Sequence, residues 1–342
     1  MVEREVIRRI IIEGQEFVNE ISLTERPFFF EQKGNYVFVG IRQAGKSYLL
    51  YQRIQQLLRE EHNINEIVYI NFDDERLRQM TADDLDLILQ AYHSLFDLCP
   101  LLFFDEIQNI EGWEHFARRL ANQKYNIYIT CSNAKMLSRE IATTLGGRFW
   151  NKDVYPYSFA EYLNARDIIL SKNWMYGKQA AEVSKAFNDY FLYGGFPELT
   201  DVIAKRVWLN DIYSKIFFSD LIVRNKVRNE EALGLLVRRL AENVKQPISY
   251  TRLANLISSI GIKISKATVI EFIRYLKESC LIFPIENYAA KFAERNSNMK
   301  HYFIDNGLLS IFLLDGNTSL LENIVAIHLY KKIGRASCRE RV

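Results

Sequence analysis

Short, nearly continuous apolar stretches alternate with longer amphipathic stretches over the first half of the chain. The apolar stretches cover residues 36–39, 67–72, 101–104 and 127–130. Each has the length of a strand and is followed by a stretch with helical periodicity. Buried strands that alternate with helices form a parallel sheet with helices on both faces. The pattern predicts an α/β fold whose ligands bind at the carboxyl ends of the strands.

Residues 1–30, which precede this region, have the pattern of a leading helix that ends near Pro27. Apolar residues at helical spacing are its expected inward positions. These are Val6, Ile10, Phe17 and Ile21.

The second half of the chain has helical periodicity through most of its length. We expect a helical connector over residues 156–228, rich in aromatic residues, with a rigid turn at residues 194–197. Residues 229–303 are predicted to form a winged-helix-like region. Ser249 and Ser265 suit the caps of two of its helices. The expected helices of this region cover residues 230–243, 249–259 and 265–279.

Residues 36–50, YVFVGIRQAGKSYLL, combine a strand, a glycine-containing loop and the start of a helix. The segment GIRQAGKS fills the spacing of a phosphate loop, and this predicts a P-loop NTPase sheet. Its glycines let backbone N–H groups converge on phosphate oxygens, beside the positive end of the helix dipole. Lys46 is expected on the β- and γ-phosphates of ATP, and Ser47 on Mg²⁺. A surface turn with a solvated lysine is the other interpretation, which the flanking strand and helix patterns disfavour. The expected nucleotide contacts are Gly40, Arg42, Gln43, Ala44, Gly45, Lys46, Ser47 and Tyr48.

The stretch LLFFDE at residues 101–106 is a second motif, with two acidic residues after a buried strand. We expect Asp105 to hold Mg²⁺ and Glu106 to orient or deprotonate the attacking water. An acidic pair can also be a solvated strand end, but the phosphate loop upstream favours the functional interpretation. Glu106 favours hydrolysis over transfer to another substrate, which argues against a small-molecule kinase. A guanine-specific Asn-Lys-x-Asp motif is not completed at residues 151–154, which read NKDV.

The strand that ends near residue 130 is followed by small polar residues. Ser132 or Asn133 is a candidate contact for the γ-phosphate or the attacking water, and either one could equally cap a helix expected over 136–144. Arg148, after two glycines, is a candidate arginine finger that would act on a neighbouring subunit. Arg42 is its rival for the same phosphate. The Arg148 hypothesis implies a homo-oligomer.

The composition is that of a globular protein with two or three domains. Its formal net charge of +2 hides an asymmetry: residues 51–150 hold 10 Lys/Arg and 15 Asp/Glu, whereas residues 201–300 hold 17 and 10. A basic second half fits a polyanionic partner, although a solvated face is the commoner cause. Double-stranded DNA is the partner we expect, through one basic helix face. Glu271 on the same face favours protein packing instead. The expected DNA contacts are Lys266, Arg274 and Lys277.

The four cysteines show neither metal-ligand spacing nor a disulfide framework, which indicates a reducing compartment. No apolar run approaches the ~18 residues that span a bilayer. We therefore expect a cytoplasmic protein without a membrane partner.

Several motifs together carry a family resemblance. GIRQAGKS, LLFFDEIQ, ITCSNAKMLSREIATTLGGRF, YPYSFAEYL, GGFPE and KHYFIDNGLL occur in this order. The set resembles the prokaryotic family that joins an AAA-type ATPase domain, AAA_14, to a DUF4143 region, and it covers about residues 21–330. Cys131 stands where that family more often has glycine. The resemblance implies an ATP-binding AAA domain over residues 31–155.

Residues 304–332 resemble the opening of the family's nuclease-like domain, with Glu322 as its helix glutamate. The later Asp and Glu-x-Lys residues of that fold are absent from this chain, so no DNA cleavage is expected. The final residues 333–342, IGRASCRERV, break from the preceding helical pattern and resemble a translated sequencing adaptor. We therefore expect the natural protein to be longer.

The leading hypothesis is a cytosolic, Mg²⁺-dependent AAA-type ATPase that couples its nucleotide state to a DNA-associated winged-helix region. The main alternative is a non-catalytic switch that retains ATP and binds DNA or a protein partner. The two differ in turnover, since a switch would bind ATP without hydrolysing it at an appreciable rate.

Overall fold

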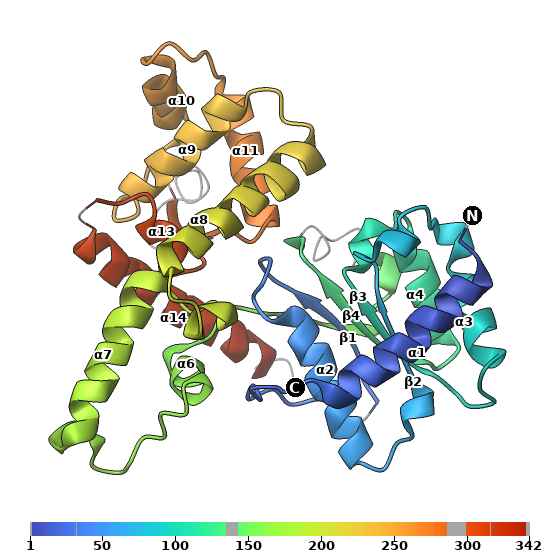
Figure 1. The fold of residues 1–342 in the computed structure, drawn as a ribbon. Helices are drawn as coiled ribbons and strands as arrows, with labels where there is room; N and C mark the ends of the chain where they lie inside the picture. The colour runs from blue at the N-terminus through green and yellow to red at the C-terminus, as the bar shows by residue number, and fades with distance from the viewer. Residues whose placement is uncertain (1, 32, 135–142, 286–298, 315, 340–342) are drawn as a thin grey trace. The chain divides into compact units, whose positions relative to one another are not determined.

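The computed structural model describes residues 2–31, 33–134, 143–285, 299–314 and 316–339. Two compact units make up the chain, which Figure 1 shows coloured by residue number. The first unit comprises Met1–Gly40 and Gly45–Val154, and the second comprises Ile41–Ala44 and Tyr155–Val342.

The first unit is built on a five-stranded sheet with the order β2-β3-β4-β1-β5. All of its strand pairs are parallel, which confirms the α/β fold predicted from the sequence. The edge strand β5 was not predicted, because its sequence FWNKD leaves Trp150 55% exposed and lacks an apolar run. The strands are β1 Asn35–Val39, β2 Ile67–Asn71, β3 Leu101–Asp105, β4 Asn126–Cys131 and β5 Phe149–Asp153.

Helices cover both faces of this sheet: Figure 1 shows α1 and α2 in front of it and α4 behind it. The α-helices are α1 Arg4–Glu20, α2 Lys46–Arg59, α3 Asp86–His93 and α4 Trp113–Asn122. Short 3₁₀ turns are η1 Ile64–Glu66, η2 Glu75–Leu77, η3 Ala82–Asp84 and η4 Ile107–Asn109.

Helix α1 differs from the predicted leading helix. It ends at Glu20, and not near Pro27. Its buried face contains Ile7, Ile10, Ile11 and Val18, whereas Phe17 is 48% exposed. The amide of Gln15 donates to the Ile67 carbonyl (2.9 Å), which ties the helix to β2.

The register of the central strands brings their carboxyl ends to one edge of the sheet. Tyr36 of β1 is paired with Tyr128 of β4, and their rings stack at 5.8 Å. Phe103 of β3 stacks on the other side of Tyr128 at 4.7 Å. Aromatic stacking of this kind across buried strands fixes the register. The loops that follow β1, β3 and β4 therefore emerge next to one another.

The second unit is mostly helical. Its first helices are α6 Phe159–Ala165, η6 Trp174–Tyr176, α7 Lys178–Tyr193, η7 Pro197–Thr200, α8 Lys205–Lys215 and the π-helix η8 Ile216–Val223. There follow α9 Glu230–Glu242, α10 Tyr250–Ser258, α11 Lys266–Glu278, β6 Ile282–Ile285, β7 Lys300–Phe303, α13 Asn306–Ser310 and α14 Asn317–Arg339. Helix α14 continues beyond residue 333, where the sequence pattern predicted that it would stop. In the described ranges no helix combines the length and apolarity needed to cross a bilayer.

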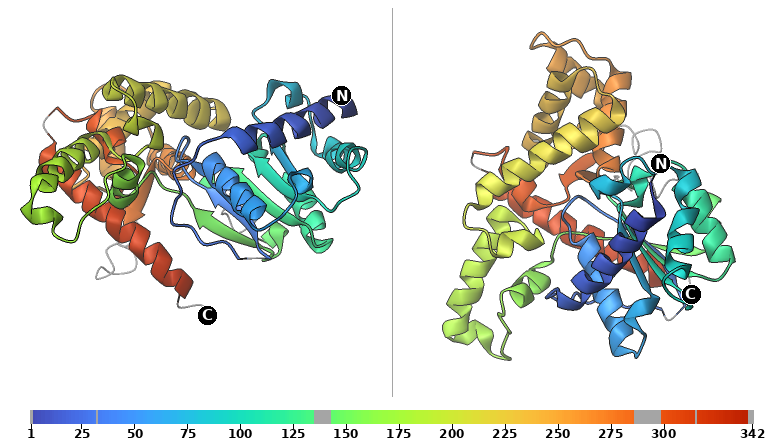
Figure 2. Two further views of the ribbon diagram at one scale, coloured as in Figure 1. Left: turned by 60° about the horizontal axis from the view of Figure 1, so that its bottom comes forward. Right: turned by 45° about the vertical axis from the view of Figure 1, so that its right-hand side comes forward.

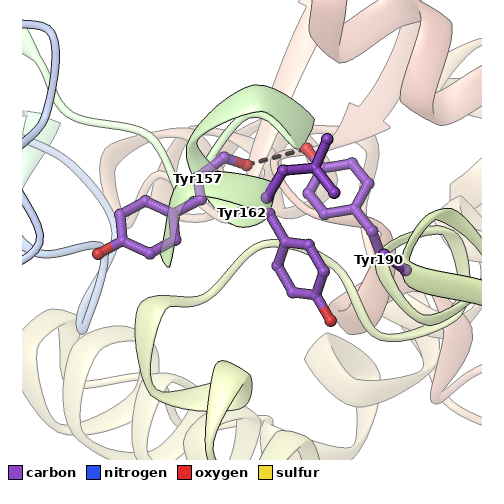
Figure 3. Close-up of a cluster of buried hydrophobic side chains, with 5 residues drawn as sticks. Tyr157, Tyr162 and Tyr190 are labelled. Carbon is purple, nitrogen blue, oxygen red and sulfur yellow. Dashed lines mark hydrogen bonds between the residues drawn. The ribbon is translucent and has the colours of Figure 1, made fainter. Parts of the chain in front are cut away.

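A cluster of tyrosines forms one core of this unit (Figure 3). The Tyr190 hydroxyl donates to the Tyr157 carbonyl (2.9 Å), and Tyr162 packs beside both. The Tyr157 N–H donates to the Gly195 carbonyl (2.6 Å), and the Gly195 N–H donates to the buried carboxylate of Asp305 (2.8 Å). The motifs YPYSFAEYL, GGFPE and FIDNGL therefore meet in one place, which gives them a structural role.

Helix α10 packs against α9 and α11, the yellow and orange helices of Figures 1 and 2. Strands β6 and β7 form an antiparallel pair, with α11 against β6 and α9 against β7. Ser249 accepts from the Arg252 N–H and Ser265 from the Thr268 N–H, so both predicted caps are confirmed. Helix positions agree with the predicted ranges to within a residue or two. The winged-helix assignment itself stays a prediction.

Candidate active site

The loop between β1 and α2 has two glycines that are required for different reasons. Gly45 caps α2 with φ 89°, a left-handed conformation that other residues rarely adopt. A Cβ at Gly40 would overlap the carbonyl oxygen of Val154, so Gly40 lets the chain after β5 approach closely. Helix α2 begins at Lys46, where the phosphate-loop pattern predicts it.

Lys46 and Ser47, the first residues of α2, face the end of β3. The Lys46 side chain is 3% exposed, and its Nζ lies 3.6 Å from Oε1 of Glu106. The Ser47 hydroxyl is hydrogen-bonded to Asp105. Tyr48, which was expected near the nucleotide, is 51% exposed, and its ring lies edge-on to that of Tyr51 (5.5 Å between centroids).

Asp105, the last residue of β3, is 1% exposed. Burial raises the pKa of its carboxyl group, as does the charge of Glu106, and hydrogen bonds from three hydroxyl groups oppose this rise. Tyr69 donates one of these bonds (2.9 Å), and Thr130 and Ser47 make the others. The part of the chain that the structure describes has no group of three or more His, Cys, Asp or Glu side chains able to hold a metal. A carboxylate with a neighbouring hydroxyl suits Mg²⁺, which usually keeps few protein ligands.

Glu106 is held in an unusual conformation directly after β3. Its φ is 53°, in the left-handed region, and its N–H donates to the Thr130 hydroxyl (2.9 Å). The Ser132 hydroxyl lies 2.6 and 2.7 Å from the two oxygens of the Glu106 carboxylate, and the amide of Gln108 donates to the same group. Thr130 also donates to Asp105, so one hydroxyl fixes both acidic residues.

The structure thus brings together Lys46, Ser47, Asp105 and Glu106, four of the residues expected at the phosphates, the metal and the water. Ser132 joins them through Glu106, which favours the site interpretation of this serine. Thr130 and Gln108 were not identified from the sequence. Only their places in the sequence could have indicated a role in the site. Thr130 is near the end of β4, and Gln108 is two residues after Glu106.

The roles expected of Asn133 and Arg148 stay predictions. Asn133 is buried, and the helix expected at 136–144 lies mostly outside the described residues. Arg148 is exposed, and its guanidinium donates to the Gly146 carbonyl (3.1 Å). An exposed arginine is compatible with a finger that acts on a neighbouring subunit and equally with a surface residue.

Arg42 belongs to the loop segment that groups with the second unit. Its Nε and Nη2 donate to the two oxygens of Asp220 (3.1 and 2.9 Å), and Arg224 donates to the same carboxylate (2.8 Å). Asp220 is 3% exposed and lies in the π-helix, a rare conformation that is often found at functional sites. No pattern in the sequence indicated this ion pair.

The expected DNA contacts lie on the exposed side of α11. Lys266, Arg274 and Lys277 are all exposed. Arg274 lies 3.7 Å from Glu271 and 4.0 Å from Glu278, so neighbouring carboxylates partly neutralise its charge.

Glu322, the residue that resembled a nuclease glutamate, lies on α14. It accepts hydrogen bonds from Lys300 (2.8 Å) and Tyr302 (2.9 Å). These contacts lower the pKa of its carboxyl group against the opposing effect of burial. In this chain the residue ties α14 to β7.

Two family models match the chain. One, described as an AAA domain, covers residues 32–163, and the other, described as a domain of unknown function, DUF8612, covers residues 184–319. The first agrees with the family expected from the sequence. For the second half the matching family is DUF8612, where the sequence led us to expect DUF4143.

Among curated proteins, the uncharacterized protein MJ1544 of Methanocaldococcus jannaschii is 31% identical over 339 residues, which cover 97% of this chain and 75% of that protein. An uncharacterized protein of Haemophilus influenzae is 30% identical over 304 residues, which cover 86% of this chain and 74% of that protein.

Among solved structures, the Aeropyrum pernix ORC1 protein in complex with DNA matches with 13% identity and a TM-score of 0.34, over 96% of this chain and 94% of that one. AMPPCP-bound DnaA from Aquifex aeolicus matches with 16% identity and a TM-score of 0.32, over 79% and 88%.

Proposed function

The chain belongs to one family with MJ1544, and its residues 32–163 match the AAA domain. On this basis we propose that it is an ATPase that binds ATP with Mg²⁺ and hydrolyses it. One observation carries the proposal: the buried Lys46 and the acidic residues Asp105 and Glu106 converge at one edge of the parallel sheet. A lysine, a metal-binding carboxylate and a second carboxylate are the groups that phosphoryl transfer to water requires.

Each residue has a distinct task in this proposal. Backbone N–H groups of the loop at residues 40–47 and the Lys46 ammonium bind the phosphates. Ser47 and Asp105 would hold Mg²⁺, which when bound would supply positive charge to the phosphate oxygens. Glu106 orients the attacking water and accepts its proton. Ser132 keeps the Glu106 carboxylate in place through its hydroxyl.

The second part of the proposal is that DNA binds to the second unit. Residues 201–300 hold 17 Lys/Arg against 10 Asp/Glu, and the basic side chains of α11 are exposed. Contacts from Lys266 and Lys277 to phosphates would make this binding weaken steeply as the salt concentration rises. Docking of a protein through apolar contacts would not weaken in this way, so a salt titration separates the two kinds of partner.

The test is the steady-state rate of ATP hydrolysis with Mg²⁺, measured for wild type and Glu106→Gln. We expect Glu106→Gln to keep ATP binding and to lose about 10²- to 10⁴-fold in rate. Glu111→Gln, the same substitution on an exposed glutamate, is the matched control and should hydrolyse ATP as wild type does. Equal rates for wild type and Glu106→Gln would contradict the ATPase assignment.

The same assay, with double-stranded DNA titrated in at low salt, tests the second part. A rate that rises with DNA in wild type, and rises less in Lys266→Ala, supports DNA coupling. ATP binding without turnover in wild type would instead support the non-catalytic switch.

A further inference from the structure

Gln108 lies in the short turn η4, two residues after Glu106, and the mechanism above gives it no task. Its Nε2 donates to Oε2 of Glu106. Its backbone N–H is hydrogen-bonded to the buried thiol of Cys131, at the end of β4. This bond anchors the backbone of the turn to β4. The side-chain amide of Gln108 therefore extends to the Glu106 carboxylate from a backbone that is held in place.

The orientation of this amide follows from chemistry. A carboxylate only accepts hydrogen bonds, so the NH₂ group of Gln108 must face Glu106. The amide oxygen Oε1 is then directed elsewhere. It is buried and has no hydrogen-bond partner among the described residues. A buried acceptor without a partner destabilises a folded protein, and such groups are rare unless they serve another purpose.

The Glu106 carboxylate has donors on both oxygens. Lys46 lies near Oε1, Gln108 donates to Oε2, and the Ser132 hydroxyl lies within hydrogen-bond distance of both. If the Lys46 side chain turns to the phosphates of ATP, its ion pair with Oε1 of Glu106 is broken. Ser132 alone could then accompany a rotating carboxylate, because its hydroxyl reaches either oxygen. Unlike Ser132, Gln108 donates to Oε2 and not to both oxygens, so its bond favours one rotation of the carboxylate.

We propose that Gln108 is a positioning residue for ATP hydrolysis, whose amide fixes the rotation of the Glu106 carboxylate toward the attacking water. The inference rests on the proposed ATPase function. It implies that Gln108 contributes to the rate and not to the stability of the fold.

The test compares Gln108→Met, which keeps the length of the side chain without its hydrogen bond, with Asn109→Ala. Asn109 belongs to the same turn, and its side-chain amide donates to the Phe72 carbonyl (3.2 Å) and to Asp73 (2.6 Å). Its backbone N–H donates to the Glu106 carbonyl (3.2 Å), a bond that alanine keeps. We expect Gln108→Met to lower kcat by about 10- to 100-fold, because small errors in position are costly to catalysis. Its KM for ATP and its melting temperature without nucleotide should not fall below those of wild type. Asn109→Ala should show the reverse, with a lower melting temperature and kcat within about twofold of wild type.

A double variant makes the test specific. In a Glu106→Gln background, Gln108→Met should cause no further loss of rate, since Gln108 acts through Glu106. An equal loss of kcat in Gln108→Met and Asn109→Ala, or an unchanged kcat in Gln108→Met, would overturn the inference while leaving the ATPase assignment intact. A wild-type rate in Glu106→Gln alone would remove the ATPase assignment itself.

Discussion

Lys46 and Glu106 form a largely enclosed ion pair, with Nζ 3.6 Å from Oε1 and exposed fractions of 3% and 14%. Two buried opposite charges depend on each other, since either one alone would be poorly solvated. The proposed site therefore holds its phosphate-binding cation and its catalytic carboxylate together. In the proposed mechanism Lys46 binds the phosphates of ATP, which leaves Glu106 available to the attacking water.

Lys46→Ala should abolish ATP binding, because the loop loses the ammonium group that binds the β- and γ-phosphates in the proposal. It should also lower the free energy of unfolding by about 1–3 kcal/mol, since Glu106 keeps Gln108 and Ser132 but loses its cation. Titration calorimetry and urea denaturation measure the two effects. Adding Glu106→Gln should recover part of the lost stability. Undiminished ATP affinity in Lys46→Ala would contradict the phosphate-loop assignment.

Thr130→Val should slow hydrolysis and destabilise the first unit by about 1–3 kcal/mol. The substitution leaves the partly buried N–H of Glu106 without the Thr130 acceptor and removes a donor from the buried Asp105. Valine has nearly the shape of threonine, so the packing is kept. Thr130→Ser retains the hydroxyl and is the matched control. Steady-state kinetics beside urea denaturation would measure both effects, and equal behaviour of Thr130→Val and Thr130→Ser would show that the hydroxyl is unimportant.

These residues show how far the sequence could predict the site. The phosphate loop, Asp105 and Glu106 were predicted because each motif is continuous in sequence and adjoins a buried strand. Thr130 meets the acidic pair only through the register of β3 and β4, in which Phe104 lies opposite Ile129. The register between two strands cannot be inferred from a single sequence, so the contact of Thr130 with the acidic pair could not be predicted.

In the fold too, features with a local sequence pattern were predicted and features without one were missed. The four buried strands were predicted from their apolar runs, whereas β5 was missed because it is exposed at the edge of the sheet. Helix α1 was predicted too long because residues 21–30 include apolar side chains without forming a helix. The ion pair of Arg42 with Asp220 joins residues 178 positions apart. Hydrophobic periodicity describes local structure only, so it could not predict this contact.

Gly40→Ala should destabilise the first unit, by about 1–3 kcal/mol, because the new methyl group would overlap the Val154 carbonyl and force the backbone to shift. The shift would also move the start of the phosphate loop and weaken ATP binding. Gly177→Ala is the control, since its φ is −127° and, in the described part of the chain, no heavy atom beyond its two chain neighbours lies within 4 Å of its Cβ position. Thermal unfolding and ATP titration would measure the difference, and equal melting temperatures for the two variants would contradict the steric argument.

Asp220→Asn tests whether Arg42 is shared between Asp220 and the phosphates. The substitution weakens the two-pronged ion pair, so Arg42 should become available to ATP and the affinity for ATP should rise. Arg42→Ala should lower the affinity and should remove the effect of Asp220→Asn in the double variant. Titration calorimetry measures all three. An unchanged ATP affinity in Asp220→Asn and Arg42→Ala would show that the arginine is purely structural.

His301→Leu should make the second unit less sensitive to acid. His301 is 3% exposed on β7, and neither ring nitrogen has a hydrogen-bond partner among the described residues. Burial, aided by the charge of Lys277, lowers the pKa of its imidazole from 6.5 to about 4. Between these two values the unfolded chain binds more protons at this position than the folded chain does. Stability is therefore full above pH 6.5 and falls as the pH drops toward 4, by about 3 kcal/mol from this one group.

The measurement is urea denaturation of wild type and His301→Leu at several values of pH between about 4 and 7, the range that spans both pKa values. Asp305 titrates in the same range with the opposite sign, because burial raises the pKa of its carboxyl group to about 6. Only the difference between the two proteins isolates His301, since the Asp305 contribution is common to both. We expect the variant to be at least as stable as wild type near neutral pH, and its advantage to grow as the pH falls. An advantage that does not change with pH would show that His301 takes up no proton on unfolding.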